Sequence, residues 1–487
     1  MVHESKMLRV IPLGLFLATC SAQAQQPPSM PQEHMHHHGD IQPVQPLFPR
    51  LGRAQEQPGA SLFSLEEALR MAEESNPTLR QAESEIRAAG ARERQAGLYP
   101  NPAIGYAGDE IRGGSVGGGK QGFFVQQTIV TGGKLGKSRN VFEQEIRLAE
   151  AEAEEQKLRV QTAVRIAYYR VLAAQELLDA RRDLAQIELD LVQARRQLLN
   201  SGQVDETELL ESQVDAGRQR LFARMQENTL HEEWRSLAAI LGRPELPLAV
   251  VAGALDRDWP EINEQSVIEA IAVQSPAVRI ADAASARAAA EIQRARSEAI
   301  PDLQLRGGLQ YNNEPLGLAP AATGWEGLAE VSLPIPVFNR NQGNVAAATA
   351  ALDRAQLEKQ RVALTLRERA ASILDEYANA KLAAVSYRDD ILPRAKQAYS
   401  LMTEKYGQML AAYPRVLQSR RKLFALQAEY ISTLENIWTT GIALQGFLLT
   451  DGLEAPAHPA ETDRPVRETD IPMPERSISP FDLAPRP

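Results

Sequence analysis

Apolar residues recur at intervals of seven through two long stretches of the chain. The first series is Val164, Val171, Leu178, Ala185, Val192 and Leu199, and the second is Leu357, Leu364, Ala371, Ala378, Val385, Leu392, Tyr399 and Tyr406. A sustained heptad pattern predicts long helices that supercoil along their neighbours. Gly202 and Gly407 interrupt the two series, and further helical stretches follow over residues 203–241 and 408–450. We therefore expect two long antiparallel helical hairpins, with the helical-tip turns at these glycines.

A second pattern, in which apolar and polar residues alternate, precedes each long helix. Within residues 302–335 the alternating apolar positions are Leu303, Leu305, Leu309 and Tyr311, then Ala329, Val331 and Leu333. Residues 103–130 carry a weaker version, with Ile104 and Tyr106 before a glycine-rich turn. A period of two predicts strands with one apolar and one polar face. The chain is therefore expected to contribute four strands, as two hairpins.

The whole arrangement occurs twice, which defines an internal repeat. Asn76-Pro77 opens a helix in the first copy, and Ser275-Pro276 opens one in the second. A capping residue followed by proline at the first helical position is a strong helix start. We assign a first repeat to residues 64–241, a linker to 242–264 and a second repeat to 265–452. The predicted fold class is mainly α with a small β part.

The N-terminus has the features of a secretion signal. Lys6 and Arg9 supply positive charge, an apolar segment follows, and Ala22-Gln23-Ala24 offers a small-x-small cleavage site. We predict a signal peptide over residues 1–24, removed after Ala24. The alternative is lipidation of Cys20, the only cysteine, because the residues before it are similar to a lipoprotein signal.

Two segments flanking the repeats have the composition of disordered chain. Residues 25–63 are rich in Pro, Gln and His, and residues 453–487 are rich in Pro. No later stretch reaches the ~20 apolar residues of a membrane helix, so insertion into lipid would require strands. Four strands are too few to close a barrel, for which about eight are needed. The sequence thus predicts that several chains contribute to one barrel.

The chain resembles the TolC family of outer-membrane efflux proteins over about residues 60–452. The resemblance is carried by the duplicated order of elements and by short motifs at the strand ends. These motifs are Gly97-Leu98-Tyr99-Pro100-Asn101-Pro102, Gly132-Gly133-Lys134, Leu333-Pro334-Ile335-Pro336-Val337-Phe338-Asn339-Arg340 and the run from Leu392-Pro393 to Tyr406-Gly407. The Gly132-Gly133-Lys134 motif and the motif from Leu333 to Arg340 are most similar to the CzcC branch, which serves heavy-metal efflux pumps.

The resemblance implies a homotrimer in the outer membrane, with a transmembrane β-barrel in contact with lipid above a periplasmic α-helical barrel. It also implies two partners, a periplasmic adaptor (membrane fusion) protein and an inner-membrane pump of the resistance-nodulation-division type. The expected function is export of solutes, heavy-metal cations in particular, through a tripartite efflux system. No cofactor is implied.

A cluster of possible metal ligands lies near the N-terminus, where His34, Met35, His36, His37 and His38 follow one another. Imidazole and thioether groups suit Cu, Zn, Co and related ions. One interpretation is capture of the metal before export. The other is a solvated low-complexity segment, because adjacent histidines on a flexible chain define no coordination geometry.

The two predicted helical tips differ in charge. Asp205, Glu206, Glu208 and Glu211 crowd the first tip, whereas the second lacks acids and carries Arg415. Acids also suit the start of any helix, so a solvated helix start is one interpretation. The other is a ring of carboxylates at a tunnel entrance, which would favour cations. In a ring of alternating tips, Arg415 would face the neighbouring acids and act as part of a gate.

Other classes of function are disfavoured by composition. The formal net charge of −10 argues against nucleic-acid binding, which needs a basic face. The predicted folded region contains one histidine, His231, and no arrangement of residues that suggests an enzyme. The main alternative to a channel is a periplasmic coiled-coil adaptor or scaffold. That alternative would require β-rich segments flanking one helical hairpin, whereas this chain has two hairpins.

Overall fold

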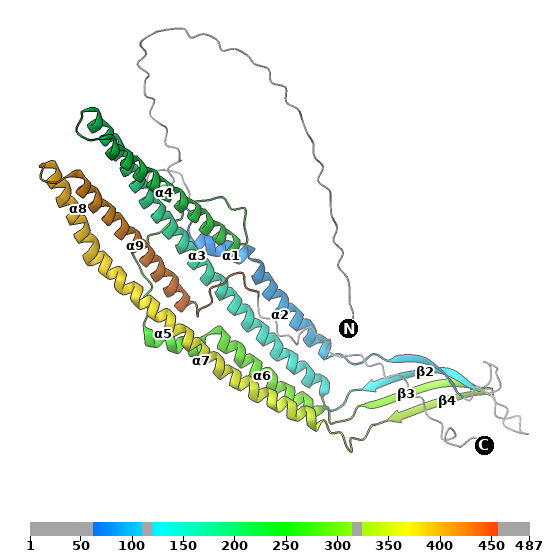
Figure 1. Ribbon diagram of the computed structural model, residues 1–487. Coiled ribbons are helices and arrows are strands. Elements are labelled where there is room, and N and C mark those ends of the chain that lie inside the picture. The colour runs from blue at the N-terminus through cyan, green and yellow to red at the C-terminus, as the bar shows by residue number, and fades with distance from the viewer. Residues whose placement is uncertain (1–61, 110–118, 314–323, 456–487) are drawn as a thin grey trace, which may run out of the picture. The chain divides into compact units, whose positions relative to one another are not determined.

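The computed structural model describes residues 62–109, 119–313 and 324–455. The helices are α1 (Leu65–Ser75), α2 (Pro77–Ala96), α3 (Lys134–Asn200), α4 (Glu206–Ile240), α5 (Glu264–Gln274), α6 (Pro276–Ser297), α7 (Gln342–Ser386), α8 (Leu392–Gly407) and α9 (Tyr413–Gln445). The strands are β1 (Ala103–Asp109), β2 (Lys120–Ile129), β3 (Leu303–Asn312) and β4 (Gly324–Ser332). Figure 1 shows these elements, which confirm the predicted mainly α fold with a small β part.

Two structurally similar repeats are joined along the longest helix. In the first repeat α3 packs on α2 and α4, and in the second α7 packs on α6 and α9. Helix α3 also packs on α6 and α9 of the second repeat (Figure 1). Its 67 residues give it a length of about 100 Å at 1.5 Å per residue. A single long helix thus provides much of the contact between the repeats.

The predicted helix starts are formed by side-chain caps. The Asn76 side chain accepts a hydrogen bond from the backbone N–H of Thr78 at 2.9 Å, and Pro77 opens α2. Ser275 caps α6 in the same way, accepting from Val278 at 3.3 Å. Asn76 is buried and also donates to the carbonyl of Ile240 at 2.8 Å. The first cap therefore also fixes the end of α4 against the start of α2.

The four strands form one antiparallel sheet in the order β1-β2-β3-β4. The central pair, β2 and β3, joins the two repeats, with Gln126 opposite Arg306. The sheet lies beyond one end of the long helices, and the turns between α3 and α4 and between α8 and α9 lie at the other end (Figure 1). In the described ranges, none of the helices has both the length and the apolarity of a membrane span.

The main hydrophobic core lies between these two ends and combines both repeats. Tyr169 of α3 stacks on Trp438 of α9 with ring centroids 3.9 Å apart. The neighbouring Tyr168 donates to the Phe63 carbonyl, and burial raises the pKa of Tyr168 to about 12. Leu255, from the segment assigned as a linker, is completely buried in this core. Residues 242–264 therefore contribute to the packing between the repeats.

The second long helix is interrupted, although its heptad pattern is continuous. A π-helical turn, Tyr387–Ile391, separates α7 from α8. Pro393 follows at the start of α8. A proline inside a helix lacks an N–H donor, and its ring clashes with the carbonyl four residues earlier, here that of Asp389. A π turn widens the helix at that carbonyl and relieves the clash. The heptad pattern alone did not predict this interruption.

Candidate functional site

The first helical tip turns at the predicted glycine. Gly202 has φ +71°, and its N–H donates to the carbonyl of Leu199 at 2.9 Å. The next N–H, from Gln203, reaches the carbonyl of Leu198 at 2.9 Å. This pair of bonds closes a helix C-terminus when the residue between helix and turn is left-handed. Glycine adopts that conformation without a steric penalty, so the sequence predicts this turn correctly.

The second tip does not turn at Gly407, and that prediction is wrong. Gly407 is the last residue of α8, and the left-handed residue is Met409, with φ 62°. Met409 donates to the Tyr406 carbonyl at 2.9 Å, and Leu410 donates to the Lys405 carbonyl at 2.8 Å. This is the bond pattern of the first tip, with methionine in the place of Gly202. The Met409 side chain is 95% exposed, so it meets no steric obstacle despite its strained backbone.

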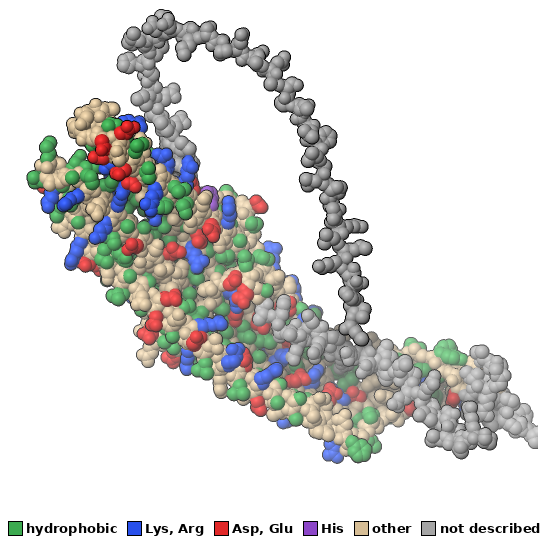
Figure 2. All heavy atoms as spheres, in the orientation of Figure 1, with side chains coloured by type: hydrophobic (Ala, Val, Ile, Leu, Met, Phe, Trp, Pro, Cys, Tyr) green, Lys and Arg blue, Asp and Glu red, His purple; other side chains and the backbone are tan. Residues whose placement is uncertain are grey.

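The four acids of the first tip are exposed on α4 and the turn before it. Figure 2 shows acidic side chains gathered at this tip. Asp205 is the helix cap, and its carboxylate accepts from the Glu208 N–H at 2.8 Å. Part of the acidic pattern is therefore structural, while Glu206, Glu208 and Glu211 leave their carboxylates available to solvent. Arg415 is exposed in the first turn of α9, and no described ion pair within the chain joins it to these acids.

An ion cluster that the sequence did not predict lies below the tips. Arg421 of α9 bonds Glu188 of α3 at 3.1 Å and Asp215 of α4 at 2.6 Å. The Glu188 side chain is completely buried, whereas Arg421 is 37% exposed. Burial acts to lower the pKa of Arg421, but its hydrogen bonds to Glu188 and Asp215 raise the pKa above its usual value. The cluster therefore holds three helices from two repeats together.

A second buried carboxylate on α3 joins the repeats nearer the sheet. Glu145 pairs with Arg92 of α2 at 3.1 Å and with Arg287 of α6 at 3.4 Å. Two turns further along α3, Glu152 is partly buried and lies near Glu145, Glu155 and Glu85. Burial, followed by repulsion from these neighbouring carboxylates, raises the pKa of Glu152 to about 7. This part of the bundle therefore holds a carboxyl group that titrates near neutral pH.

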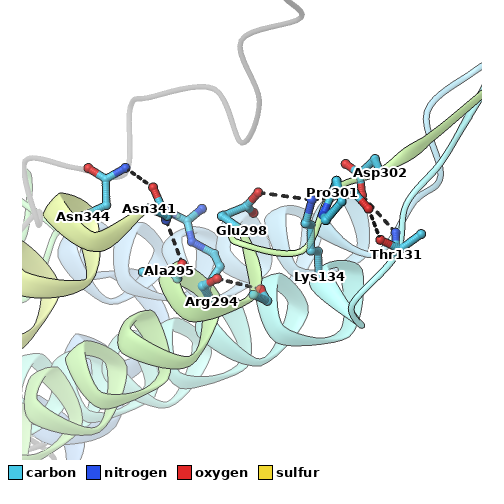
Figure 3. Close-up of polar contacts among 10 residues, drawn as sticks. Thr131, Lys134, Arg294, Ala295, Glu298, Pro301, Asp302, Asn341 and Asn344 are labelled. Atoms are coloured by element: carbon cyan, nitrogen blue, oxygen red, sulfur yellow. Dashed lines mark hydrogen bonds and ion pairs between the residues drawn. The ribbon is translucent and has the colours of Figure 1, made fainter. Parts of the chain in front are cut away.

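A third set of polar contacts between the two repeats lies where the strands meet the helices, as Figure 3 shows. Lys134, at the start of α3, extends to Asp302 at 2.9 Å and to Glu298 at 3.7 Å. The same Asp302 carboxylate accepts from the backbone N–H of Thr131 at 2.9 Å. These contacts connect the end of β2 in one repeat to the start of β3 in the other.

The N-terminal candidates, Cys20 and the cluster from His34 to His38, lie outside the described residues. Within the described ranges, no group of three or more His, Cys, Asp and Glu side chains could hold a metal ion. The acids of the first tip are exposed, whereas Glu188 and Glu145 are buried between helices.

Comparison with known proteins matches the chain to one family profile and to several named relatives. The sequence profile of outer membrane efflux proteins matches residues 68–243 and 267–448, which is one match for each repeat. The cobalt-zinc-cadmium resistance protein CzcC of Cupriavidus metallidurans is 25% identical over 83% of this chain and 92% of its own length. The nickel-cobalt-cadmium resistance protein NccC of Alcaligenes xylosoxydans xylosoxydans is 25% identical over 63% of this chain and 69% of its own.

One further relative has a different named role, and a solved structure shows the same fold. The pyoverdine export outer membrane protein OpmQ of Pseudomonas putida is 26% identical over 50% of this chain and 51% of its own. The solved structure of CusC superposes with a TM-score of 0.63 at 17% identity, covering 79% of this chain and 91% of CusC. The profile covers both repeats and well over half of the sequence, so this chain belongs to the family of outer membrane efflux proteins.

Proposed function

We propose that this chain is the outer-membrane channel subunit of a tripartite efflux system and that its solutes are heavy-metal cations. The observation that carries the substrate class is the match to CzcC, which extends through both repeats and 92% of that protein. NccC, a second metal-resistance protein, supports the same class. The exposed acids of the first tip fit a mouth that concentrates cations, because carboxylate groups attract them electrostatically.

The proposed assembly is a homotrimer with two protein partners. A periplasmic adaptor would contact the helical tips, and an inner-membrane resistance-nodulation-division pump would supply the driving force. Support comes from family membership and from the position of the exposed tips at the end of the helices remote from the sheet (Figure 1). A detergent-stable trimer on size-exclusion chromatography with light scattering is the expected result. A monodisperse monomer that keeps its β signal would contradict the proposal.

Growth of a deletion strain tests the substrate class. Loss of the gene is expected to lower tolerance to Co²⁺, Zn²⁺, Cd²⁺ or Ni²⁺, and the wild-type gene is expected to restore it. The similarity to OpmQ makes organic export the competing hypothesis. Loss of tolerance to organic solutes alone, with metal tolerance unchanged, would contradict the metal assignment and leave the channel assignment intact.

The N-terminal segment is proposed to capture metal before export, on the basis of its His and Met side chains. Joint replacement of His34, His36, His37 and His38 by alanine tests this role in the complemented strain. Reduced metal tolerance at unchanged channel abundance is expected. Tolerance equal to that of the wild type would identify the segment as a solvated tail.

Export is proposed to proceed through a signal peptide cleaved after Ala24. Mass spectrometry of the mature protein should then find Gln25 at its N-terminus. A diacylglyceryl group on Cys20 would instead establish lipidation and a longer mature chain.

A further inference from the structure

A small cavity lies between helices α3, α4 and α9, and most of its lining is apolar. Its volume is about 160 Å³. Leu184 of α3 is buried in the lining, and Phe222 of α4 and Phe424 of α9 contribute two half-buried aromatic rings. An apolar cavity of about 150 Å³ admits benzene, so this cavity has room for one aromatic ring.

Helical periodicity explains why these side chains meet. Residues three and four apart lie on one face of a helix. The lining of two helices follows this spacing, with Leu177, Arg181 and Leu184 on α3 and Arg421, Phe424 and Ala428 on α9. On α4, Arg218 and Phe222 are four apart, which places the guanidinium beside the ring. Each of the three helices therefore turns one face towards a shared cavity.

Cationic side chains surround the same cavity. The Arg181 guanidinium lies 5.7 Å from the centroid of the Phe222 ring, and the Arg218 guanidinium lies 5.4 Å from it. Arg181 and Arg421 belong to the lining, and Gln219 adds an amide. Two guanidinium groups, one from α3 and one from α4, thus converge on a single ring at the cavity.

The two arginines over this ring have no anionic partner anywhere in the part of the chain that the structure describes. The neighbouring Arg182, by contrast, pairs with Glu227 at 3.1 Å. The carboxylates of Glu188 and Asp215 are already engaged by Arg421. Like charges held near one ring repel each other, so an anion placed between them stabilises the site.

We propose that this cavity binds a small aromatic carboxylate, with its ring against the apolar lining and its carboxylate between Arg181 and Arg218. Guanidinium groups hold carboxylates through paired, charge-assisted hydrogen bonds. The rings of Phe222 and Phe424 offer surfaces on which an aromatic ring packs favourably. The inference does not rest on the proposed export of metal cations, because the ligand has the opposite charge.

The combination of charge and apolar surface disfavours other classes of ligand. Metal cations and amines are repelled by the unpaired arginines. An inorganic anion pairs with the arginines but leaves the apolar lining in contact with water. A neutral aromatic molecule fills the cavity but does not compensate the two positive charges. The site therefore favours a ligand that carries both a ring and a carboxylate.

Fluorine NMR of the purified full-length chain in detergent tests this site, with para-fluorobenzoate as the probe. Broadening of the probe signal, followed over a titration, measures the dissociation constant. We expect a value on the order of 1 mM, because the probe has few atoms with which to make contacts. Saturating probe should also raise the Tm of the wild type, since it binds the folded chain.

Variants of the lining separate the two halves of the site. Arg181→Gln and Arg218→Gln should each weaken binding by about tenfold, because each removes a charge-assisted contact. Ala428→Phe should abolish binding, because the larger side chain fills the cavity while both arginines remain. Arg220→Gln is the matched control, since Arg220 is exposed on the same helix and outside the lining. It should bind the probe as the wild type does, and circular dichroism shows whether each variant is folded.

Two ligand controls keep the test independent of the variants. Para-fluorobenzamide and para-fluorobenzylamine carry the same ring without the carboxylate, and the wild type should bind each of them at least about tenfold more weakly. Equal affinity for the benzoate and the benzamide, or no broadening of the benzoate signal, would overturn the proposal. Wild-type affinity in folded Arg181→Gln and Arg218→Gln, or undiminished binding by Ala428→Phe, would overturn it as well.

Discussion

Arg421 of α9 forms two hydrogen bonds with the fully buried carboxylate of Glu188 on α3, across 233 positions of sequence. The same guanidinium holds Asp215 of α4. A buried carboxylate that loses its cation is strongly destabilising, typically by about 3–5 kcal/mol. The Arg421–Glu188 contact therefore secures the second repeat to the first near the helical tips.

Replacement of Arg421 by alanine should lower the stability of the assembled protein. We expect a loss of about 2 kcal/mol, below the range for fully buried pairs because Arg421 is partly exposed to water. Thermal denaturation followed by circular dichroism measures the effect as a lower Tm. Arg415→Ala, on the same helix but exposed, is the matched control and should leave Tm unchanged. Equal Tm values for Arg421→Ala and the wild type would show that Glu188 finds another partner.

The left-handed turn at Met409 predicts opposite effects for two glycine substitutions. Met409→Gly removes a steric penalty of about 1 kcal/mol and should raise stability, offset in part by greater freedom of the unfolded chain. Gly202→Ala introduces such a penalty in the first tip and should lower stability by about 1 kcal/mol. Gly407→Ala, inside α8 with open space around its Cα, should be neutral or mildly stabilising. If Gly407→Ala lowered stability as much as Gly202→Ala does, Gly407 would be the left-handed turn residue instead.

Glu152 predicts that stability falls as the pH rises towards neutrality. Its pKa is raised from 4.5 to about 7 in the folded chain. The folded state therefore retains a proton that the unfolded state releases, and the associated stability is present below pH 4.5 and lost by about pH 7. The whole shift would correspond to about 3 kcal/mol, but Glu152 is only partly buried, so solvent screening reduces the expected loss to about 1–2 kcal/mol. Glu152→Gln should flatten the dependence of Tm on pH across this interval, whereas substitution of the exposed Glu150 should not. If the Tm of Glu152→Gln depended on pH in the same way as that of the wild type, the raised pKa of Glu152 would be contradicted.

Arg415 is predicted to help close the mouth by facing acids of a neighbouring tip. Exposed ion pairs contribute only about 0–1 kcal/mol each, so such contacts would be released easily when a partner binds. Arg415→Glu should raise conductance in planar bilayers and sensitise cells to bulky antibiotics, while Arg415→Lys should behave as the wild type. If Arg415→Glu assembled normally and its conductance were unchanged, Arg415 and the tip acids would be solvated surface charges with no role in closing the mouth.

Local patterns were sufficient for the elements and for several of their ends. The caps at Asn76 and Ser275, the turn at Gly202 and the apolar faces of the strands each depend on a few neighbouring residues. Side-chain hydrogen bonds to the next turn, the backbone freedom of glycine and the two-residue period of a strand act over that short range. The duplication itself is visible because the same local signals recur in the same order.

Tertiary structure decided which residues from the two repeats meet. Arg421 reaches Glu188, and Glu145 reaches Arg287, because long helices pack with a particular rotation and axial offset. A heptad pattern restricts the buried face of each helix but leaves its axial alignment with a distant helix open. The turn at Met409 shows the same limit, since hydrogen bonds at the end of α8 placed a methionine where the sequence pattern favoured Gly407. Local chemistry determined the helices and strands, and long-range packing determined the joints between the repeats.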